Sequence, residues 1–169
     1  MSEPAAVTTV PRVDLARYMG DWFEICRLPM RFEDETAFDI TATYCMEGDA
    51  VRVDNRCIDE DGKPSQAIGE ARPEDDTNAR LTVSFLPEFL RWVPFTKGDY
   101  WVLKLDEAYS VALVGTPDRK FLWLLARTHM IADAVREDYL AEARRQGFDL
   151  SRLITPRQSG RKVEDASFE

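Results

Sequence analysis

Residues 19–29 read MGDWFEICRLP, a run that begins with Gly-x-Trp and then alternates large apolar side chains with polar or small ones. Alternation with a period of two is typical of a β-strand, because successive side chains point to opposite faces of a sheet. The first face would carry Trp22, Glu24 and Cys26, and the second Phe23 and Ile25. Since both faces are largely apolar, we expect one to line the inside of a barrel and the other to lie under a helix.

Seven further runs have the composition of β-strands and are separated by turn residues. With the first, they cover residues 20–29, 38–46, 50–58, 65–72, 79–86, 99–106, 109–116 and 121–127. Apolar side chains then recur at helical spacing before Gly147, at Ile131, Val135, Tyr139, Leu140 and Ala143. The predicted fold class is therefore all-β, an eight-stranded antiparallel up-and-down β-barrel with a C-terminal α-helix packed outside.

The rest of the chain suggests a single domain with loose ends. We expect a flexible N-terminal tail over residues 1–10, the barrel and helix over 11–157, and a flexible C-terminal tail over 158–169. Within the second part, FDLSRLIT at 148–155 has the composition of a short edge strand.

Charge and cysteine content narrow the function classes. The 31 acidic residues outnumber the 22 basic ones, so the net charge of −9 disfavours nucleic acid, which a basic field binds. The three cysteines, Cys26, Cys45 and Cys57, have no metal-binding spacing and suit free thiols, with one bridge as the alternative. With no leader or lipidated Cys in the sequence as written, we expect a cytoplasmic location, or a periplasmic or outer-membrane one if a leader was removed.

The predicted barrel interior combines bulky side chains with small and polar ones. Small residues such as Ala42 and Ala67 leave space, and eight strands are about the fewest that enclose one small ligand. Tyr100, expected near the open end, and Asn55 could bind the polar end of a ligand. The predicted ligand-binding residues are Phe38, Ile40, Ala42, Tyr44, Val53, Asn55, Val83, Phe85, Tyr100, Val102, Leu113, Phe121, Trp123 and Leu125.

Three short motifs resemble the conserved regions of lipocalins. They are GDW at 20–22, LDEAY at 105–109 and LLART, which ends near Arg127. The longer runs RYMGDWFEI, ITATY and YWVLKLDEAYSVALVGTPDRKFLWLLART are similar to bacterial lipocalins and their apolipoprotein D relatives. The resemblance implies a structural motif of Gly20, Trp22, Asp106 and Arg127, in which the arginine packs across the tryptophan where the barrel closes.

The resemblance also implies a function. It predicts binding, transport or storage of a small hydrophobic ligand of the fatty acid or lysophospholipid class, without a cofactor, metal or enzymatic activity. The alternative is a thiol-dependent lipid-modifying enzyme, an isomerase or reductase that uses Cys26 or Cys57 as its nucleophile. The single histidine, His129, has no second histidine with which to form a zinc site.

Two further predictions concern the ends of the barrel. Glu24 faces the closed end and is expected to pair with Arg127 or Lys104. The connection over 86–95 is unusually apolar for a loop, which predicts a lid over the cavity or a surface that docks on a membrane or a second subunit. Its large apolar residues are Leu86, Phe89, Leu90, Trp92, Val93 and Phe95.

Overall fold

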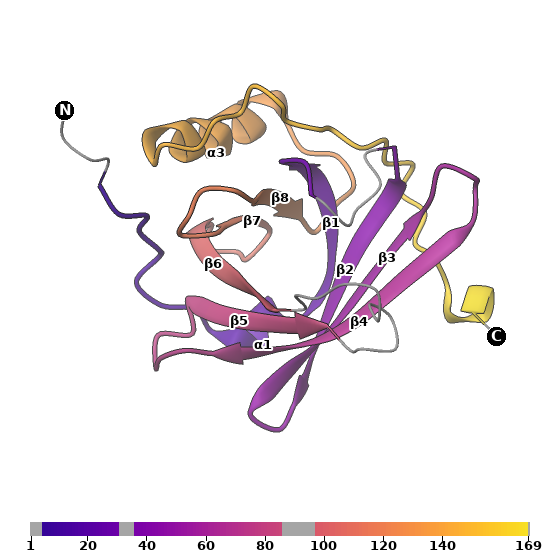
Figure 1. Cartoon of the computed structure of the whole chain (residues 1–169), viewed down its shortest axis with the longest axis horizontal. Helices are drawn as coiled ribbons and strands as arrows, with labels where there is room; N and C mark the ends of the chain where they lie inside the picture. The colour runs from indigo at the N-terminus through magenta and orange to yellow at the C-terminus, as the bar shows by residue number, and fades with distance from the viewer. Residues whose placement is uncertain (1–4, 31–35, 86–96, 169) are drawn as a thin grey trace.

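Eight antiparallel strands form a closed barrel in the computed structural model, which describes residues 5–30, 36–85 and 97–168 (Figure 1). The strands are β1 (Gly20–Arg27), β2 (Phe38–Glu47), β3 (Ala50–Ile58), β4 (Pro64–Pro73), β5 (Arg80–Phe85), β6 (Lys97–Leu105), β7 (Val111–Gly115) and β8 (Leu122–Ala126). Each pairs with the next in the sequence, and β8 pairs with β1. The predicted fold class is confirmed.

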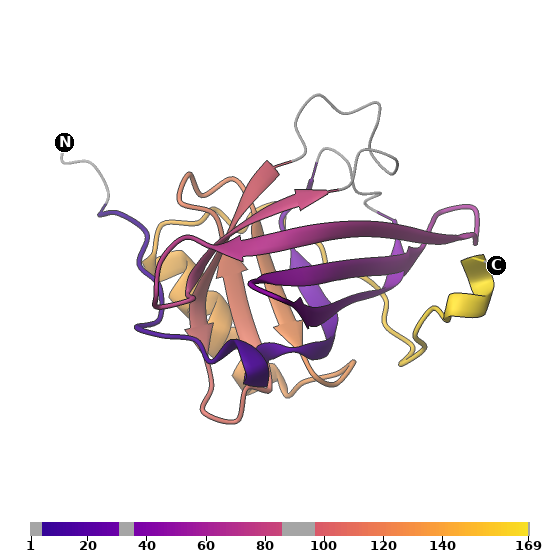
Figure 2. The same cartoon turned by 90° about the horizontal axis from the view of Figure 1, so that it is seen from below.

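Within the described residues, three helical segments accompany the barrel. They are α1 (Leu15–Tyr18), α3 (Asp133–Arg145) and the 3₁₀ helix Asp165–Phe168. The predicted helix is α3, which lies outside the barrel beside β7 and β8 (Figure 1). The sequence patterns did not indicate α1, which is only one turn long. Figure 2 shows α1 at the same end of the barrel as the turn between β6 and β7.

The buried apolar residues form two separate clusters. The inner cluster fills the closed half of the barrel and includes Trp22, Tyr44, Val53 and Leu125. The outer cluster joins the outward faces of β1, β7 and β8 to three residues of α3, Tyr139, Leu140 and Ala143. Phe23 and Ile25 belong to the outer cluster, as predicted. Both faces of the first strand are therefore covered, one by each cluster.

Two of the predicted inward side chains belong to the outer cluster instead. A β-bulge between Glu24 and Cys26 shifts the pairing of β1 with β8, so Cys26 shares a face with its partner Leu124. Leu113 is also in the outer cluster, while its neighbours Ala112 and Val114 face inward. The predicted inward positions of Cys26 and Leu113 are therefore wrong.

The C-terminal segment packs on the barrel instead of forming the predicted flexible tail. The side-chain amide of Gln158 donates to the backbone oxygens of Glu24 at 2.7 Å and Ile40 at 2.9 Å. The Asp39 carboxylate accepts bonds from the backbone N–H and hydroxyl of Ser159, and Val163 is buried. These contacts hold the segment against the outer face of β1 and β2 through residue 163.

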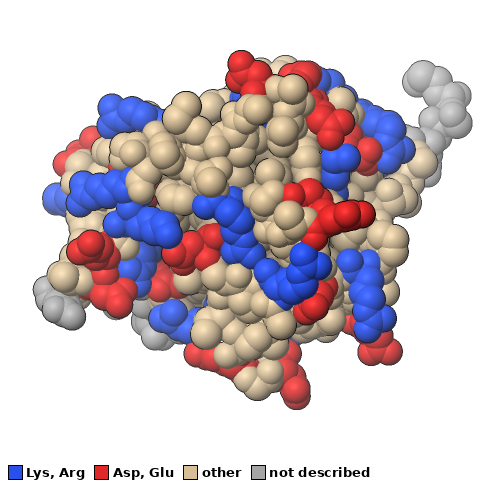
Figure 3. Space-filling view, turned by 180° about the vertical axis from the view of Figure 1, so that it is seen from behind, with Lys and Arg blue, Asp and Glu red and all other residues tan. Residues whose placement is uncertain are grey.

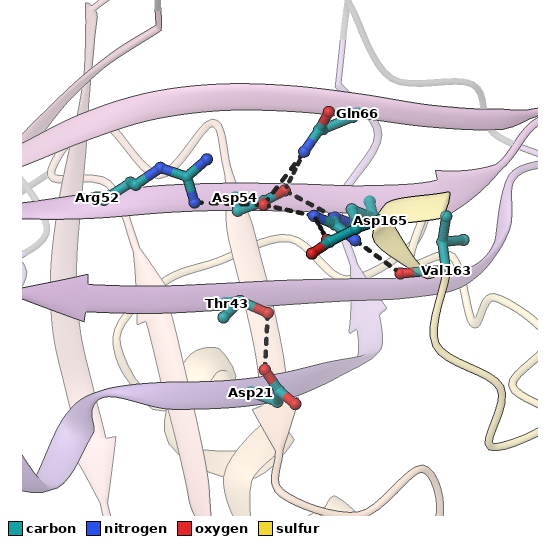
Figure 4. A network of polar contacts seen from close by, with 8 residues as sticks. Asp21, Thr43, Arg52, Asp54, Gln66, Val163 and Asp165 are labelled. Atoms are coloured by element: carbon teal, nitrogen blue, oxygen red, sulfur yellow. Dashed lines mark hydrogen bonds and ion pairs between the residues drawn. The ribbon is translucent and has the colours of Figure 1, made fainter. Parts of the chain in front are cut away.

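A polar network fastens the same segment to β3 (Figure 4). The Arg56 guanidinium donates to the Asp54 carboxylate at 3.0 Å, the Asp165 carboxylate at 2.5 Å and the Val163 carbonyl at 2.9 Å. Gln66 on β4 also donates to Asp54 at 3.2 Å. Asp54 is consequently buried, although the alternation of β3 predicts a face open to water.

The described part of the N-terminal segment is packed as well. Val7 is buried in the outer cluster, and the backbone N–H of Thr8 donates to the Gln146 side chain at 2.8 Å. The predicted flexible tail is therefore wrong for residues 5–10. The predicted edge strand over 148–155 reduces to a single bridge between Ile154 and Arg27.

Two features bear on membranes and partners. The apolar connection over 86–95 lies outside the described residues, so its role as a lid or docking surface stays a prediction. Among the residues that the structure describes, no helix is both long and apolar enough to cross a membrane. On the face shown in Figure 3, basic and acidic side chains are interspersed.

Candidate ligand-binding site

Trp22 closes one end of the barrel. Its side chain is fully buried, and its indole N–H donates to the Tyr18 carbonyl of α1 at 2.9 Å. The Arg127 guanidinium stacks on the indole, with 3.8 Å between the guanidinium carbon and the ring centroid. This contact confirms the pairing that the family resemblance implies. Gly20 is required beside it, because its φ of +101° disfavours any side chain and a Cβ would lie 3.3 Å from Arg127.

Arg127 also ties together the chain segments that meet at this end. Its guanidinium donates to the backbone oxygens of Tyr109 at 3.0 Å, Asp21 at 3.0 Å and Arg17 at 2.9 Å. Asp106 holds the neighbouring turn by accepting the backbone N–H groups of Ser110 at 2.7 Å and Val111 at 2.9 Å. The predicted motif residues therefore act as the structural closure of the barrel.

A cluster of three tyrosines lies directly above this closure. Tyr18 packs on Trp22 with 4.9 Å between ring centroids. Its hydroxyl lies 2.7 Å from that of Tyr100, which donates to the Tyr44 hydroxyl at 3.0 Å. Burial raises the pKa of all three, that of Tyr44 to about 12, so they stay protonated at neutral pH. The hydroxyl of Tyr100 thus lies at the closed end of the barrel, beside Tyr18, so the prediction that Tyr100 lies near the open end is wrong.

A row of short side chains crosses the barrel wall above the tyrosines. Ala42, Asn55 and Ala67 are paired across β2, β3 and β4, and all three are only half-buried. They share the lumen face with Tyr44, Val53 and Ala71 of the inner cluster. Inward residues of a closed barrel stay partly exposed only where its interior is hollow. This row therefore marks the wall of a lumen.

The open half of the lumen is bordered by aromatic rings. Trp123 and Phe85 pack against the inner cluster as partly buried residues. Phe121, just before β8, stacks on Trp123 with ring centroids 6.3 Å apart. Phe38, at the start of β2, instead has Arg157 of the C-terminal segment over its ring, at 4.3 Å.

Arg27 is a buried charge that sequence reasoning missed. It pairs with Trp123 across β1 and β8, which places it on the lumen face, and its side chain is fully buried. Its guanidinium lies 3.2 Å from the Glu24 carboxylate. Lys104 pairs with Asp138 of α3, so the predicted pairing of Glu24 with Arg127 or Lys104 is wrong. Arg27 faces inward only because of the bulge, and a period-two pattern in the sequence does not reveal where a bulge occurs.

The predicted site residues can now be placed. Nine belong to the inner cluster or pack against it: Ala42, Tyr44, Val53, Val83, Phe85, Tyr100, Val102, Trp123 and Leu125. Asn55 lies on the same face in the half-buried row, and Ile40 is buried but belongs to neither cluster. Leu113 is separated from them by the barrel wall. Ala112 and Val114 take its place on the inner face.

The described residues offer neither a metal-binding cluster nor a reactive thiol at Cys26. Within the described residues, no group of three or more His, Cys, Asp or Glu side chains could hold a metal ion. Cys26 lies in the outer cluster, and burial raises the pKa of its thiol to about 11. A nucleophilic thiolate needs a lowered pKa and access to its substrate. Cys26 therefore does not fit the thiol-dependent alternative.

We expect Cys26 to resist thiol reagents in the folded protein. At pH 8, a thiol with a raised pKa of about 11 is thiolate for only about one part in a thousand, and burial slows its reaction further. Exposed Cys45 should react at once with a disulfide reagent, while Cys26 should react only after unfolding. Comparing the parent with Cys45→Ser and Cys26→Ser variants assigns each phase. Rapid modification of Cys26 in the native state would contradict its placement.

Comparison with known proteins identifies the family. The family model described as "Lipocalin-like domain" matches residues 13–158. The chain belongs to the lipocalin family. Temperature-induced lipocalin-1 of Arabidopsis thaliana is 35% identical to this lipocalin, over 98% of this chain and 94% of the relative. Outer membrane lipoprotein Blc of Escherichia coli K12 is 41% identical, over 93% and 86%.

The barrel of this lipocalin is also similar to solved structures. Apocrustacyanin C1 superposes with a TM-score of 0.70, covering 90% of this chain and 83% of the other, at 14% identity. At that identity the match supports the fold alone. The resemblance to bacterial lipocalins drawn from the three motifs is confirmed. Lipocalins bind small hydrophobic ligands, which agrees with the half-buried row of Ala42, Asn55 and Ala67 on the inner face of the barrel.

Proposed function

We propose that this lipocalin carries or stores one small hydrophobic molecule of the fatty acid or lysophospholipid class inside its barrel. The half-buried row of Ala42, Asn55 and Ala67 is the observation that supports this proposal most directly. Two short side chains leave space for an acyl chain, and one amide supplies a polar contact. An apolar pocket with a few polar groups is the usual arrangement for binding such a ligand.

The name of one relative supports a cellular location for this lipocalin. Blc of Escherichia coli is named an outer membrane lipoprotein. By that similarity, we propose that this lipocalin works at the outer membrane or in the periplasm. Fractionation of the native host cells with an antibody to this chain would test the location. Recovery in the cytoplasmic fraction would contradict it.

Mass spectrometry of the native protein gives the direct test of ligand binding. We expect protein purified from its own host without detergent to release one class of lipid on organic extraction, at about one molecule per barrel. Protein that had first been unfolded, stripped of lipid and refolded serves as the control. Extracts that match this control would contradict the carrier function.

Filling the lumen should weaken ligand binding without unfolding the barrel. Ala67→Trp places a large ring into the space beside Asn55, so we expect affinity for a fluorescent polyene fatty acid to fall at least about tenfold, or about 1.4 kcal/mol. The matched control is Glu70→Trp, on the outer face of the same strand, which should keep parental affinity. Equal affinities for the two variants would place the ligand outside the barrel.

A further inference from the structure

The three tyrosine hydroxyls above Trp22 form an incomplete chain of hydrogen bonds. Tyr100 lies in the middle, 2.7 Å from the Tyr18 hydroxyl and 3.0 Å from that of Tyr44. Tyr100 donates its only hydroxyl hydrogen to Tyr44, so Tyr18 must donate to Tyr100. The three hydroxyl groups carry three hydrogens, but only two hydrogen bonds join them. The hydroxyl hydrogen left over belongs to Tyr44, and no described residue accepts it.

This remaining donor lies at the edge of the hollow part of the barrel. Tyr44 is two residues from Ala42 on the same face of β2, and it pairs with Val53 of β3. Asn55, on the same face, is the diagonal neighbour of Tyr44 across these strands. The Asn55 side chain also has no hydrogen-bond partner among the described residues, and it is half-buried. A buried hydrogen-bond donor without an acceptor is energetically costly. A ligand oxygen that accepts this hydrogen would remove that cost and so bind favourably.

We infer that this lipocalin binds its ligand with an uncharged oxygen acceptor pointing to the closed end of the barrel, where it accepts the hydroxyl hydrogen of Tyr44. This inference rests on the proposed function, and it narrows the ligand class to lipids with an alcohol, carbonyl, ester or protonated acid group at the deep end. The hydrocarbon chain then extends toward the open end, past Ala42 and Ala67. This orientation is the reverse of the one that the sequence predicts, in which Tyr100 binds the polar end of the ligand near the open end of the barrel.

The local charges favour an uncharged group over a carboxylate. Glu24 raises the pKa of Tyr44 more than Arg127 lowers it, so the nearby negative charge has the stronger effect at this hydroxyl. The three nitrogens of the Arg127 guanidinium already donate to three backbone carbonyls, and the guanidinium stacks on Trp22. An ionised carboxylate beside Tyr44 would lose its hydration without gaining a cationic partner. A neutral acceptor avoids that cost.

Two ligands of equal length test the inference. 1-Nonanol carries an oxygen acceptor at its end, and 1-chlorononane has a similar shape with a much weaker acceptor. Their affinities are measured by displacement of the fluorescent polyene fatty acid from the full chain. We expect Tyr44→Phe to weaken nonanol binding about three- to tenfold, the worth of one hydrogen bond, and chlorononane binding less than about twofold.

Tyr18→Phe is the matched control, because it removes the other end of the same chain. Tyr100 would still donate to Tyr44, so the Tyr44 hydrogen would stay available and nonanol affinity should remain within about twofold of the parent. A thermal melt of each variant verifies folding. If Tyr44→Phe fails to fold, the parental preference for nonanol over chlorononane and its persistence in Tyr18→Phe still test the inference.

The possible results of these measurements distinguish the deep placement of the ligand oxygen from the proposed carrier function. Equal losses for both ligands in Tyr44→Phe, or a similar nonanol loss in Tyr18→Phe, would overturn the deep placement of the oxygen while leaving the carrier function intact. Failure of the parent to bind the polyene fatty acid or either nine-carbon ligand would instead contradict the proposed function itself.

Discussion

Replacing Trp22 with alanine is expected to lower the free energy of unfolding by about 3 to 5 kcal/mol, as large-to-small substitutions of buried aromatic residues do. The indole is fully buried and joins α1 to the barrel through its hydrogen bond to the Tyr18 carbonyl. Its loss leaves a cavity and removes the ring on which the Arg127 guanidinium stacks. Urea unfolding followed by far-ultraviolet circular dichroism measures the change.

Met130→Ala provides the control for Trp22→Ala. Met130 is 72% exposed, so its truncation should change stability by less than about 0.5 kcal/mol. A Trp22→Ala variant as stable as the parent would mean that the closed end does not depend on the packing of Trp22. The closure of the barrel would then have to come from the strand pairing alone.

Leu113→Ala should lower the free energy of unfolding by about 2 to 5 kcal/mol and leave ligand affinity unchanged. Leu113 is fully buried in the outer cluster, with Tyr139 and Leu140 of α3 on the same side of the barrel wall. The cavity created by the substitution therefore lies under the helix and not in the lumen. Urea unfolding and displacement of the polyene fatty acid measure the two effects separately.

Leu125→Ala is the comparison that tells the two faces apart. Leu125 is also a buried leucine and lies on the neighbouring strand β8, but it belongs to the inner cluster. Its truncation should destabilise the protein to a similar degree and also change the affinity for the fatty acid. If Leu113→Ala altered affinity as much as Leu125→Ala, the assignment of Leu113 to the outer face would be wrong.

Much of the fold follows from patterns that are local in the chain. Strand positions depend on alternation over five to ten residues, and the helix on apolar spacing before Gly147, so both could be predicted from neighbouring residues. The predicted pairing of Arg127 with Trp22 came from family resemblance, and the structure confirms it with a 3.8 Å contact. Most of the predicted wall residues also lie on the inner face.

The errors occur where alternation is interrupted. A bulge between Glu24 and Cys26 reverses the facing of every later residue in β1, which turns Cys26 outward and Arg27 inward. In β7 the run Val111–Gly115 is apolar on both faces, so its composition does not distinguish Leu113 from Val114. Neither strand contains a local signal that tells which side is the lumen.

The sequence by itself determined the number of strands, their order, the outer helix and the closure of one end, because these depend on short-range periodicity and on a motif. Only the tertiary structure decided which face each residue of β1 and β7 occupies, and that residues 158–168 cover β1 to β3. It alone also brought together the hydroxyls of Tyr18, Tyr44 and Tyr100. Such features depend on strand register and on contacts between residues far apart in the chain, and no pattern of neighbouring residues specifies either.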